Sequence, residues 1–220
     1  MIPLRDYNPT RRPSLLTWGL ILINLGVYFY LAQNPVMDEA AIQRYALIPA
    51  DISAGRHLST LITSLFLHAN LLHVAGNMLF LWIFGNNVED HVGEIKFLII
   101  YVASGIAGSL LQVYINPTST IPTLGASGAI SGLLAAYVLY FPRARILTFI
   151  VPFFFFTLSA YVFIGYWIAL QALNAYLSIG VTGGGVAFFA HVGGFVSGLI
   201  LAILLRPRER ADSAGAPFSY

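Results

Sequence analysis

Residues 125–136 read Gly-Ala-Ser-Gly-Ala-Ile-Ser-Gly-Leu-Leu-Ala-Ala, an apolar run in which a small residue returns at every fourth position. The repeated small residues are Gly128, Gly132 and Ala136. A second stripe with the same spacing follows later in the chain and consists of Ala190, Gly194, Gly198 and Ala202. In lipid, such stripes allow helix backbones to approach closely. The sequence therefore predicts two packed membrane helices that bring together a hydroxyl and an imidazole, those of Ser127 and His191.

The composition identifies a membrane protein. Of the 220 residues 58% are hydrophobic and only 9% are charged, and the mean hydropathy is +0.78. Soluble domains carry about 25% charged residues. The chain has no cysteine, which excludes disulfides and thiolate metal sites, and its net charge of +2 without a basic patch gives no reason to expect nucleic-acid binding.

A membrane-spanning helix needs roughly 20 mostly apolar residues. Six segments qualify as candidates, at about 15–33, 69–87, 95–114, 126–141, 157–178 and 185–205. We therefore expect an all-α, polytopic bundle of six helices over residues 15–205, preceded by a short segment, 1–14, and followed by a disordered tail, 206–220.

Basic residues in short loops predict the orientation. With six spans, one side of the membrane collects nine of the eleven basic residues, and the other side only Arg44 and Arg56. This asymmetry favours an even number of spans with both termini cytoplasmic. We expect an integral protein of a prokaryotic inner membrane, with an organelle membrane as the open alternative.

Three segments that connect the predicted spans also have predictable features. The loop 34–68 is expected to be partly helical and to lie at the membrane interface. Residues 146–156 are apolar, and we expect a membrane-skimming connection there; the alternative is an extension of the fifth helix, kinked at Pro152. The glycine-rich segment from Gly180 to Gly185 has the flexibility of a lid.

The polar residues of the spans suggest nucleophilic chemistry. All nine acidic residues lie outside the predicted spans, which argues against an ion-coupled carrier and against a Ser-His-Asp triad in the bilayer. What remains is a dyad with Ser127 as the nucleophile and His191 as the base.

Two further residues fit such a site. His73 and Asn77 are four residues apart, hence on one helix face, and both side chains can donate hydrogen bonds to an oxyanion. The Ser127 backbone N–H, at a helix start, can add a third donor. His68 lies five residues before His73 and is expected to point elsewhere. A metal site built from His68, His73 and His191 is disfavoured, because no H-E-x-x-H motif and no nearby carboxylate accompany them.

These motifs resemble the rhomboid family of intramembrane serine proteases. The resemblance rests on Gly125-Ala126-Ser127-Gly128, on Ala190-His191 with Gly194, and on His73 with Asn77, and it runs from the first span through the sixth. It implies a six-helix bundle that cleaves transmembrane protein substrates in the lipid bilayer, near the outer membrane face, without metal or cofactor. It also implies Ser127 and His191 as the catalytic residues and His73 and Asn77 as the oxyanion hole, and assigns Glu89 a structural position.

The chain departs from the family pattern at two places. Ser59 and Thr60 stand where many members carry a Trp-Arg pair that anchors the first loop. Ser131 stands where many members carry an aromatic residue that stacks on the catalytic imidazole, so either Ser131 hydrogen-bonds His191 or another helix supplies the packing.

Two rival functions follow from the same residues. A catalytically silent protein that binds membrane helices would use the bundle without the chemistry. A small transporter is the weaker rival, because the sequence shows no intramembrane carboxylate and no long internal repeat. The sequence does not predict the oligomeric state.

Overall fold

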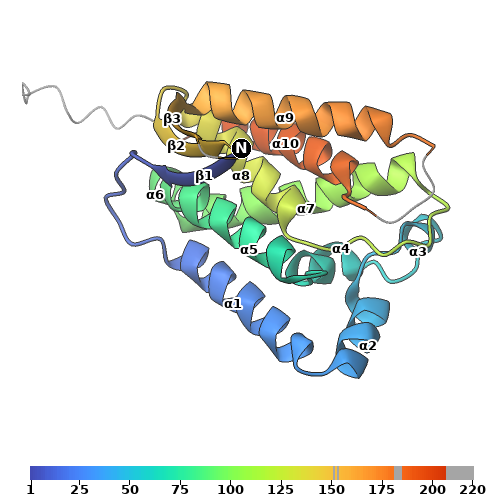
Figure 1. Cartoon of the computed structure of the whole chain (residues 1–220). Coiled ribbons are helices and arrows are strands. Elements are labelled where there is room, and N and C mark those ends of the chain that lie inside the picture. The colour runs from blue at the N-terminus through green and yellow to red at the C-terminus, as the bar shows by residue number, and fades with distance from the viewer. Residues whose placement is uncertain (151, 153, 181–184, 207–220) are drawn as a thin grey trace, which may run out of the picture.

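The computed structural model describes residues 1–150, 152, 154–180 and 185–206. Helices occupy all six predicted positions (Figure 1). They are α1 (Leu15–Ala32), a continuous segment made of α5 (Leu71–Phe80), the π-helical turn η2 (Leu81–Gly85) and α6 (Asn86–Val92), and then α7 (Glu94–Ile115), α8 (Ser127–Tyr140), α9 (Ala160–Leu177) and α10 (Phe188–Leu204). The fold is thus the expected helical membrane bundle.

Length and composition suit a membrane span in four of these helical segments: Leu15–Ala32, Leu71–Val92, Glu94–Ile115 and Ala160–Leu177. The other two, α8 and α10, are apolar but shorter. Every residue of α8 from Gly128 to Tyr137 is buried. A helix enclosed on all sides is apolar all round, and it can be short because it begins inside the bundle.

Backbone contacts join α8 to α10, as the two small-residue stripes predict. A Cβ atom added at Gly194 would overlap the carbonyl oxygen of Gly128, and one added at Gly198 would overlap the backbone of Gly132. On the other side of α10, a Cβ at Gly108 of α7 would overlap the carbonyl oxygen of Ala190. These three helices therefore pack at a separation that only glycine permits at the contact points.

The connection after α8 differs from the expectation. Residues 145–150 and 154–159 form two antiparallel strands, β2 (Arg145–Ile150) and β3 (Phe154–Ser159), and β1 (Ile2–Asp6) pairs with β2 to complete a three-stranded sheet. The register places Ile2 opposite Phe149 and Arg145 opposite Ser159. The alternative of a fifth helix extended back through Pro152 is wrong, because these residues form strands and α9 begins only at Ala160. The sheet itself was not expected, since β2 pairs with the distant N-terminal segment.

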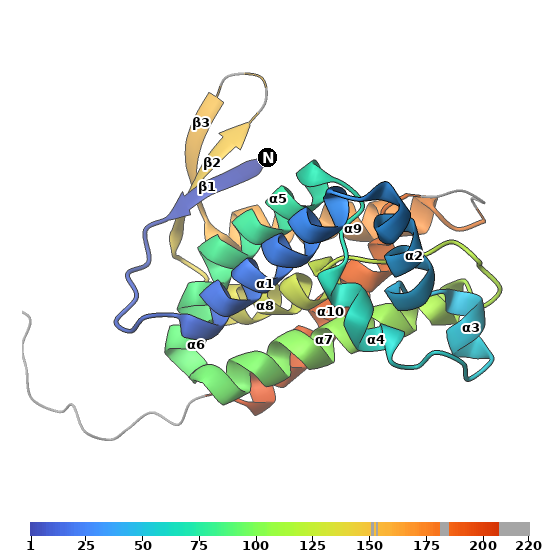
Figure 2. The same cartoon turned by 90° about the horizontal axis from the view of Figure 1, so that it is seen from below.

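Figure 2 shows the sheet projecting from one end of the bundle, which we call the sheet end. A half-buried carboxylate fastens the sheet there: Asp6 Oδ2 accepts hydrogen bonds from Tyr137 Oη at 2.9 Å and from Asn87 Nδ2 at 2.7 Å. Burial raises the pKa of the Asp6 carboxyl, and the bond from Tyr137 opposes this effect.

Glu89 fixes the first helix to the bundle. Its carboxylate accepts hydrogen bonds from the backbone N–H groups of Leu16 and Thr17 at 2.9 and 2.7 Å and from the Thr17 hydroxyl at 2.7 Å. A carboxylate at a helix N-terminus satisfies otherwise unpaired donors and complements the helix dipole. Glu89 thus serves the structural position that the family resemblance implies.

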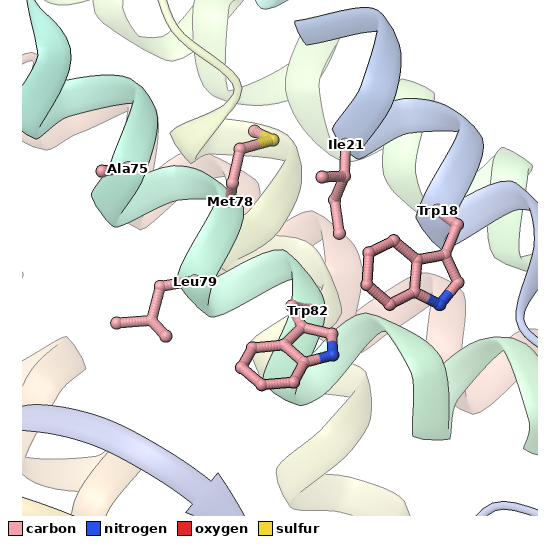
Figure 3. Close-up of a pocket in the computed structure, with 6 residues that line it drawn as sticks. All are labelled: Trp18, Ile21, Ala75, Met78, Leu79 and Trp82. Atoms are coloured by element: carbon pink, nitrogen blue, oxygen red, sulfur yellow. The ribbon is translucent and has the colours of Figure 1, made fainter. Parts of the chain in front are cut away.

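Farther along α1 the packing loosens into an apolar groove of about 340 Å³ (Figure 3). The groove is lined from α1 by Trp18 and Ile21, and from α5 and η2 by Ala75, Met78, Leu79 and Trp82. The lining includes none of the candidate site residues, so the groove is separate from the site.

The opposite end, which we call the loop end, carries the first loop. As expected, this loop is partly helical, with α2 (Pro35–Tyr45), α3 (Pro49–Ser53), α4 (Thr60–Thr63) and the 3₁₀ turn η1 (Ser64–Phe66). Seven of the nine basic residues in the described part of the chain belong to the sheet end, and Arg44 and Arg56 belong to the loop end. Most of the expected lid and the expected tail lie outside the described residues.

Candidate active site

Ser127 and His191 meet at the loop end, where α8 and α10 begin. Ser127 is the first residue of α8, and His191 lies in the first turn of α10. The distance from Ser127 Oγ to His191 Nε2 is 2.8 Å, and His191 is buried. The contact follows from Gly128 and Gly194, which come shortly after Ser127 and His191 and hold the two backbones together. A hydroxyl at this distance from an imidazole nitrogen has the geometry of a nucleophile and its base.

The chain reaches Ser127 through a glycine with a positive φ. Gly125 has a φ of +119°, a conformation that side-chain-bearing residues rarely adopt, and its N–H donates to the Ser64 carbonyl at 2.9 Å. A Cβ at Gly125 would lie 2.7 Å from His73 Nε2 and 3.5 Å from Asn77 Nδ2. Both predicted donors of α5 therefore approach the backbone just before Ser127.

A third donor is available at the same place. Ser127 is the first residue of α8, so its backbone N–H has no carbonyl partner within the helix. The structure thus brings all four predicted site residues and this N–H to one side of the loop end. Three donors converging beside a nucleophile can stabilise an oxyanion.

His68 also belongs to this cluster, contrary to the expectation that it points elsewhere. Asn77 Nδ2 and His68 Nε2 are 2.9 Å apart, and the rings of His68 and His73 lie 5.0 Å apart between centroids. The expectation assumed helical spacing, but α5 begins only at Leu71, so His68 approaches from an irregular segment. Burial, and secondarily the neighbouring His73, lowers the pKa of His68 to about 4.

The packing of the imidazole comes from α9. The ring of Trp167 lies 5.9 Å from that of His191 at an interplanar angle of 32°, and Gln171 Oε1 lies 2.8 Å from His191 Nδ1. Ser131 instead donates its hydroxyl to the Ser127 carbonyl at 2.6 Å. Of the two alternatives left by the sequence, another helix therefore supplies the packing.

Sequence reasoning missed Gln171, although a signal was present. It is one of two side-chain amides in an otherwise apolar predicted span. A polar residue in a membrane helix marks a candidate functional position. The sequence prediction considered only carboxylates as a third group beside Ser127 and His191, so it did not include the amide of Gln171.

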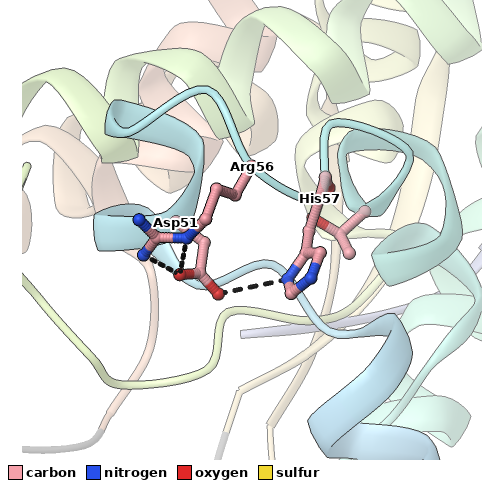
Figure 4. A network of polar contacts seen from close by, with 4 residues as sticks. Asp51, Arg56 and His57 are labelled. Atoms are coloured by element: carbon pink, nitrogen blue, oxygen red, sulfur yellow. Dashed lines mark hydrogen bonds and ion pairs between the residues drawn. The ribbon is translucent and has the colours of Figure 1, made fainter.

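A polar network in the first loop links Asp51, Arg56 and His57 (Figure 4). Asp51 accepts from Arg56 Nε at 3.2 Å and contacts His57 Nδ1 at 3.3 Å. The bond from Arg56 is the main reason why the pKa of the Asp51 carboxyl is lowered. Nearby, the backbones of Leu47 and Thr123 form an isolated β-bridge to the segment that precedes Ser127. This bridge ties the first loop to the approach to the nucleophile.

Comparisons with known proteins agree with this architecture. The sequence pattern of the Rhomboid domain matches residues 55–208. The chain is 33% identical to rhomboid protein 1, mitochondrial, of Saccharomyces cerevisiae, over 94% of this chain and 59% of the relative. It is 31% identical to the human presenilin-associated rhomboid-like protein, mitochondrial, over 82% of this chain and 46% of the relative.

A plant relative, the Arabidopsis thaliana rhomboid-like protein 11, chloroplastic, is 33% identical over 60% of this chain and 44% of its own length. The chain thus spans between 44% and 59% of the curated relatives named here.

These relatives correct the expected location. The expected location is the inner membrane of a prokaryote, but these matched proteins are eukaryotic and are named as mitochondrial or chloroplastic. They point to an organellar membrane instead. The expectation was wrong because hydropathy and charge asymmetry report insertion into a bilayer and do not distinguish one organelle from another.

The match of the Rhomboid domain covers more than half of the chain, and it includes every residue of the candidate site. The helical bundle and the matched relatives agree with it. This chain belongs to the rhomboid family.

Proposed function

We propose that this protein is an intramembrane serine endopeptidase that cleaves transmembrane proteins with a Ser127–His191 dyad. Rhomboid proteins are generally intramembrane serine proteases, which gives the reaction class. The observation that carries the proposal for this chain is the 2.8 Å contact between Ser127 Oγ and His191 Nε2 inside the bundle.

The reaction follows from these groups. His191 Nε2 takes the proton of the Ser127 hydroxyl while Oγ attacks the scissile carbonyl carbon. The negative charge on the carbonyl oxygen is met by His73, Asn77 and the Ser127 N–H. The C–N bond then breaks, and the leaving amine takes the proton from His191. Water, deprotonated by the same imidazole, attacks the acyl ester and restores the Ser127 hydroxyl.

Substrate access is constrained by where the dyad lies. Ser127 is half-buried at the start of an enclosed helix, so a substrate helix must unwind locally to reach it. Small residues beside the scissile bond fit such a recessed nucleophile. We infer that substrates enter between α5 and α9, the two helices that flank the site with His73, Asn77 and Trp167.

The test is cleavage of a generic transmembrane substrate in liposomes by the wild-type chain, Ser127→Ala and His191→Ala. The proposal predicts cleavage by the wild type, and loss of cleavage in both variants with unchanged thermal unfolding. Cleavage that persists in Ser127→Ala would contradict it.

The rival of a silent helix-binding protein predicts a different result. Such a protein would retain substrate helices without cutting them, and Ser127→Ala would change neither binding nor product. The hydrogen-bonded Ser127–His191 pair favours the protease, because binding alone gives no reason to bury an imidazole against a hydroxyl.

A further inference from the structure

Gln171 contacts the side of His191 that faces away from Ser127. Its Oε1 atom lies 2.8 Å from His191 Nδ1, while Nε2 of the same ring lies 2.8 Å from Ser127 Oγ. Both ring nitrogens therefore have a partner, one on α8 and one on α9. Trp167 precedes Gln171 by four residues, so the indole and the amide share one face of α9 and meet the imidazole together.

The chemistry of the amide oxygen selects one tautomer of the imidazole. A carboxamide oxygen can only accept a hydrogen bond, so the 2.8 Å contact places the proton on His191 Nδ1. The other nitrogen, Nε2, is then unprotonated and can receive the Ser127 proton. The opposite tautomer would set two lone pairs against each other at Gln171 and would leave Nε2 unable to act as a base.

The same contact supports the charged state that the reaction creates. When Nε2 takes the serine proton, the ring becomes a cation and its bond from Nδ1–H to the amide oxygen becomes charge-assisted and stronger. An amide also costs less to bury in a membrane protein than the carboxylate of a Ser-His-Asp triad.

We propose that Gln171 is a positioning residue that acts through His191 by fixing its tautomer and ring orientation. This inference rests on the proposed Ser127–His191 dyad. It adds an uncharged residue of α9 in the place that the carboxylate has in a Ser-His-Asp triad. It also makes the competence of the dyad depend on the placement of α9, because Gln171 and Trp167 belong to the same helix.

The kinetic test compares Gln171→Met, which keeps the length but removes the acceptor, with Gln171→Glu, which keeps an acceptor oxygen. We expect Gln171→Met to lower kcat by about 10- to 100-fold with little change in KM, as losses of a partner that orients a reactive imidazole do. Gln171→Glu should recover much of this loss. The matched control is Asn174→Leu, which alters the other side-chain amide of α9 and should leave both constants unchanged.

A second measurement reads the tautomer without substrate. In wild-type chain labelled with ¹⁵N-histidine, the His191 signals, identified by comparison with His191→Gln, should show a protonated Nδ1 and an unprotonated Nε2. Gln171→Met should give a mixture of tautomers, and Asn174→Leu should resemble the wild type.

Two outcomes would overturn the inference: an unprotonated Nδ1 in the wild type, or an unchanged tautomer together with an unchanged kcat in Gln171→Met. A wild-type chain that showed the expected tautomer but did not cleave any substrate would contradict the proposed protease function and not the role of Gln171 at the imidazole. The two failures can therefore be told apart.

Discussion

Two pairs of helices surround the candidate site, and they are held together by different means. Glycine packing joins α8 and α10, whose backbones touch at Gly128 and Gly194. Aromatic side chains join α5, η2 and α9: the ring centroids of Phe80 and Phe163 are 6.3 Å apart, those of Phe80 and Trp167 6.2 Å and those of Phe84 and Phe163 6.0 Å. The dyad lies on the glycine-packed pair, and the groups that assist it lie on the aromatic pair.

The difference has a physical consequence. Backbone-to-backbone packing leaves no side chain that can change rotamer, so it fixes the Ser127–His191 distance rigidly. Aromatic side chains can shift and repack, so α5 and α9 can separate from each other while α8 and α10 stay in contact. The proposed protease would need one rigid part and one adaptable part to admit a helix-sized substrate, and these two pairs of helices could supply them.

The largest expected effect comes from breaking the glycine-packed pair. Gly194→Ala places a Cβ atom against the carbonyl oxygen of Gly128, and neither backbone can move aside. Overpacking of this kind costs about 3 kcal/mol or more where no side chain can yield. We expect loss of activity and a marked fall in the temperature of thermal unfolding, measured in detergent.

The control for this substitution is Gly165→Ala on α9, where a Cβ would meet nothing within 4 Å. Gly165→Ala should unfold like the wild type. Equal stability of the two variants would show that the small-residue stripes do not set the helix separation.

The next effect concerns the assisting groups of the aromatic pair. Asn77→Ala removes one proposed oxyanion donor and should lower turnover by about 100-fold or less, because His73 and the Ser127 N–H would still stabilise the oxyanion. The loss should appear in kcat, since the donor acts on charge that develops only in the transition state. Initial cleavage rates over a range of substrate concentrations measure this, and unchanged turnover would remove Asn77 from the site.

A smaller effect is expected from Trp167, which packs beside His191 without a hydrogen bond to it. An aromatic contact of this kind contributes about 0.5–1.5 kcal/mol, so Trp167→Ala should lower turnover by about 10-fold or less. Trp167→Phe retains a ring and should stay near wild-type turnover. If Trp167→Phe were as damaging as Gly194→Ala, the aromatic pair would not be the adaptable part.

The last expected effect is a pH dependence that originates at His68. The pKa of His68 is lowered from 6.5 to about 4 when the protein folds, so the folded state favours the neutral ring. Its contribution to stability is therefore present above about pH 6.5 and is lost as the pH falls from 6.5 towards 4.

The unfolding temperature of the wild type should fall as the pH is lowered from 6.5 towards 4. The fall should be smaller in His68→Gln. The exposed His57 provides the control, and His57→Gln should follow the wild-type curve. A His68→Gln variant with an unchanged pH response would show that another group causes the acid sensitivity.

The contact between α8 and α10 could be predicted from the sequence because it depends on a short-range repeat of small residues. Small residues at every fourth position form one helix face, and two such faces imply contact. Ser127 and His191 lie in the first turns of these two helices, so the same pattern predicted their meeting. The family resemblance then supplied the reaction class and the expected role of each residue.

The aromatic pair and the sheet could not be predicted in the same way. Aromatic residues are scattered over all faces of apolar segments, so Phe80, Phe163 and Trp167 carry no periodic signal. The strand β2 pairs with Ile2–Asp6, more than 130 residues earlier in the chain, and no local pattern reports such a partner. His68 was misplaced because helical spacing was extended to a segment that is not helical.

The most direct test of the dyad is covalent trapping. Wild-type chain, Ser127→Ala and His191→Ala, each reconstituted in liposomes, would be treated with a fluorophosphonate, and the adduct located by mass spectrometry of peptides. The account predicts one adduct on Ser127 of the wild type, none at residue 127 in Ser127→Ala, and labelling slowed by at least about 100-fold in His191→Ala. A folded wild-type chain that is not labelled at Ser127, or labelling of His191→Ala at the wild-type rate, would contradict the account.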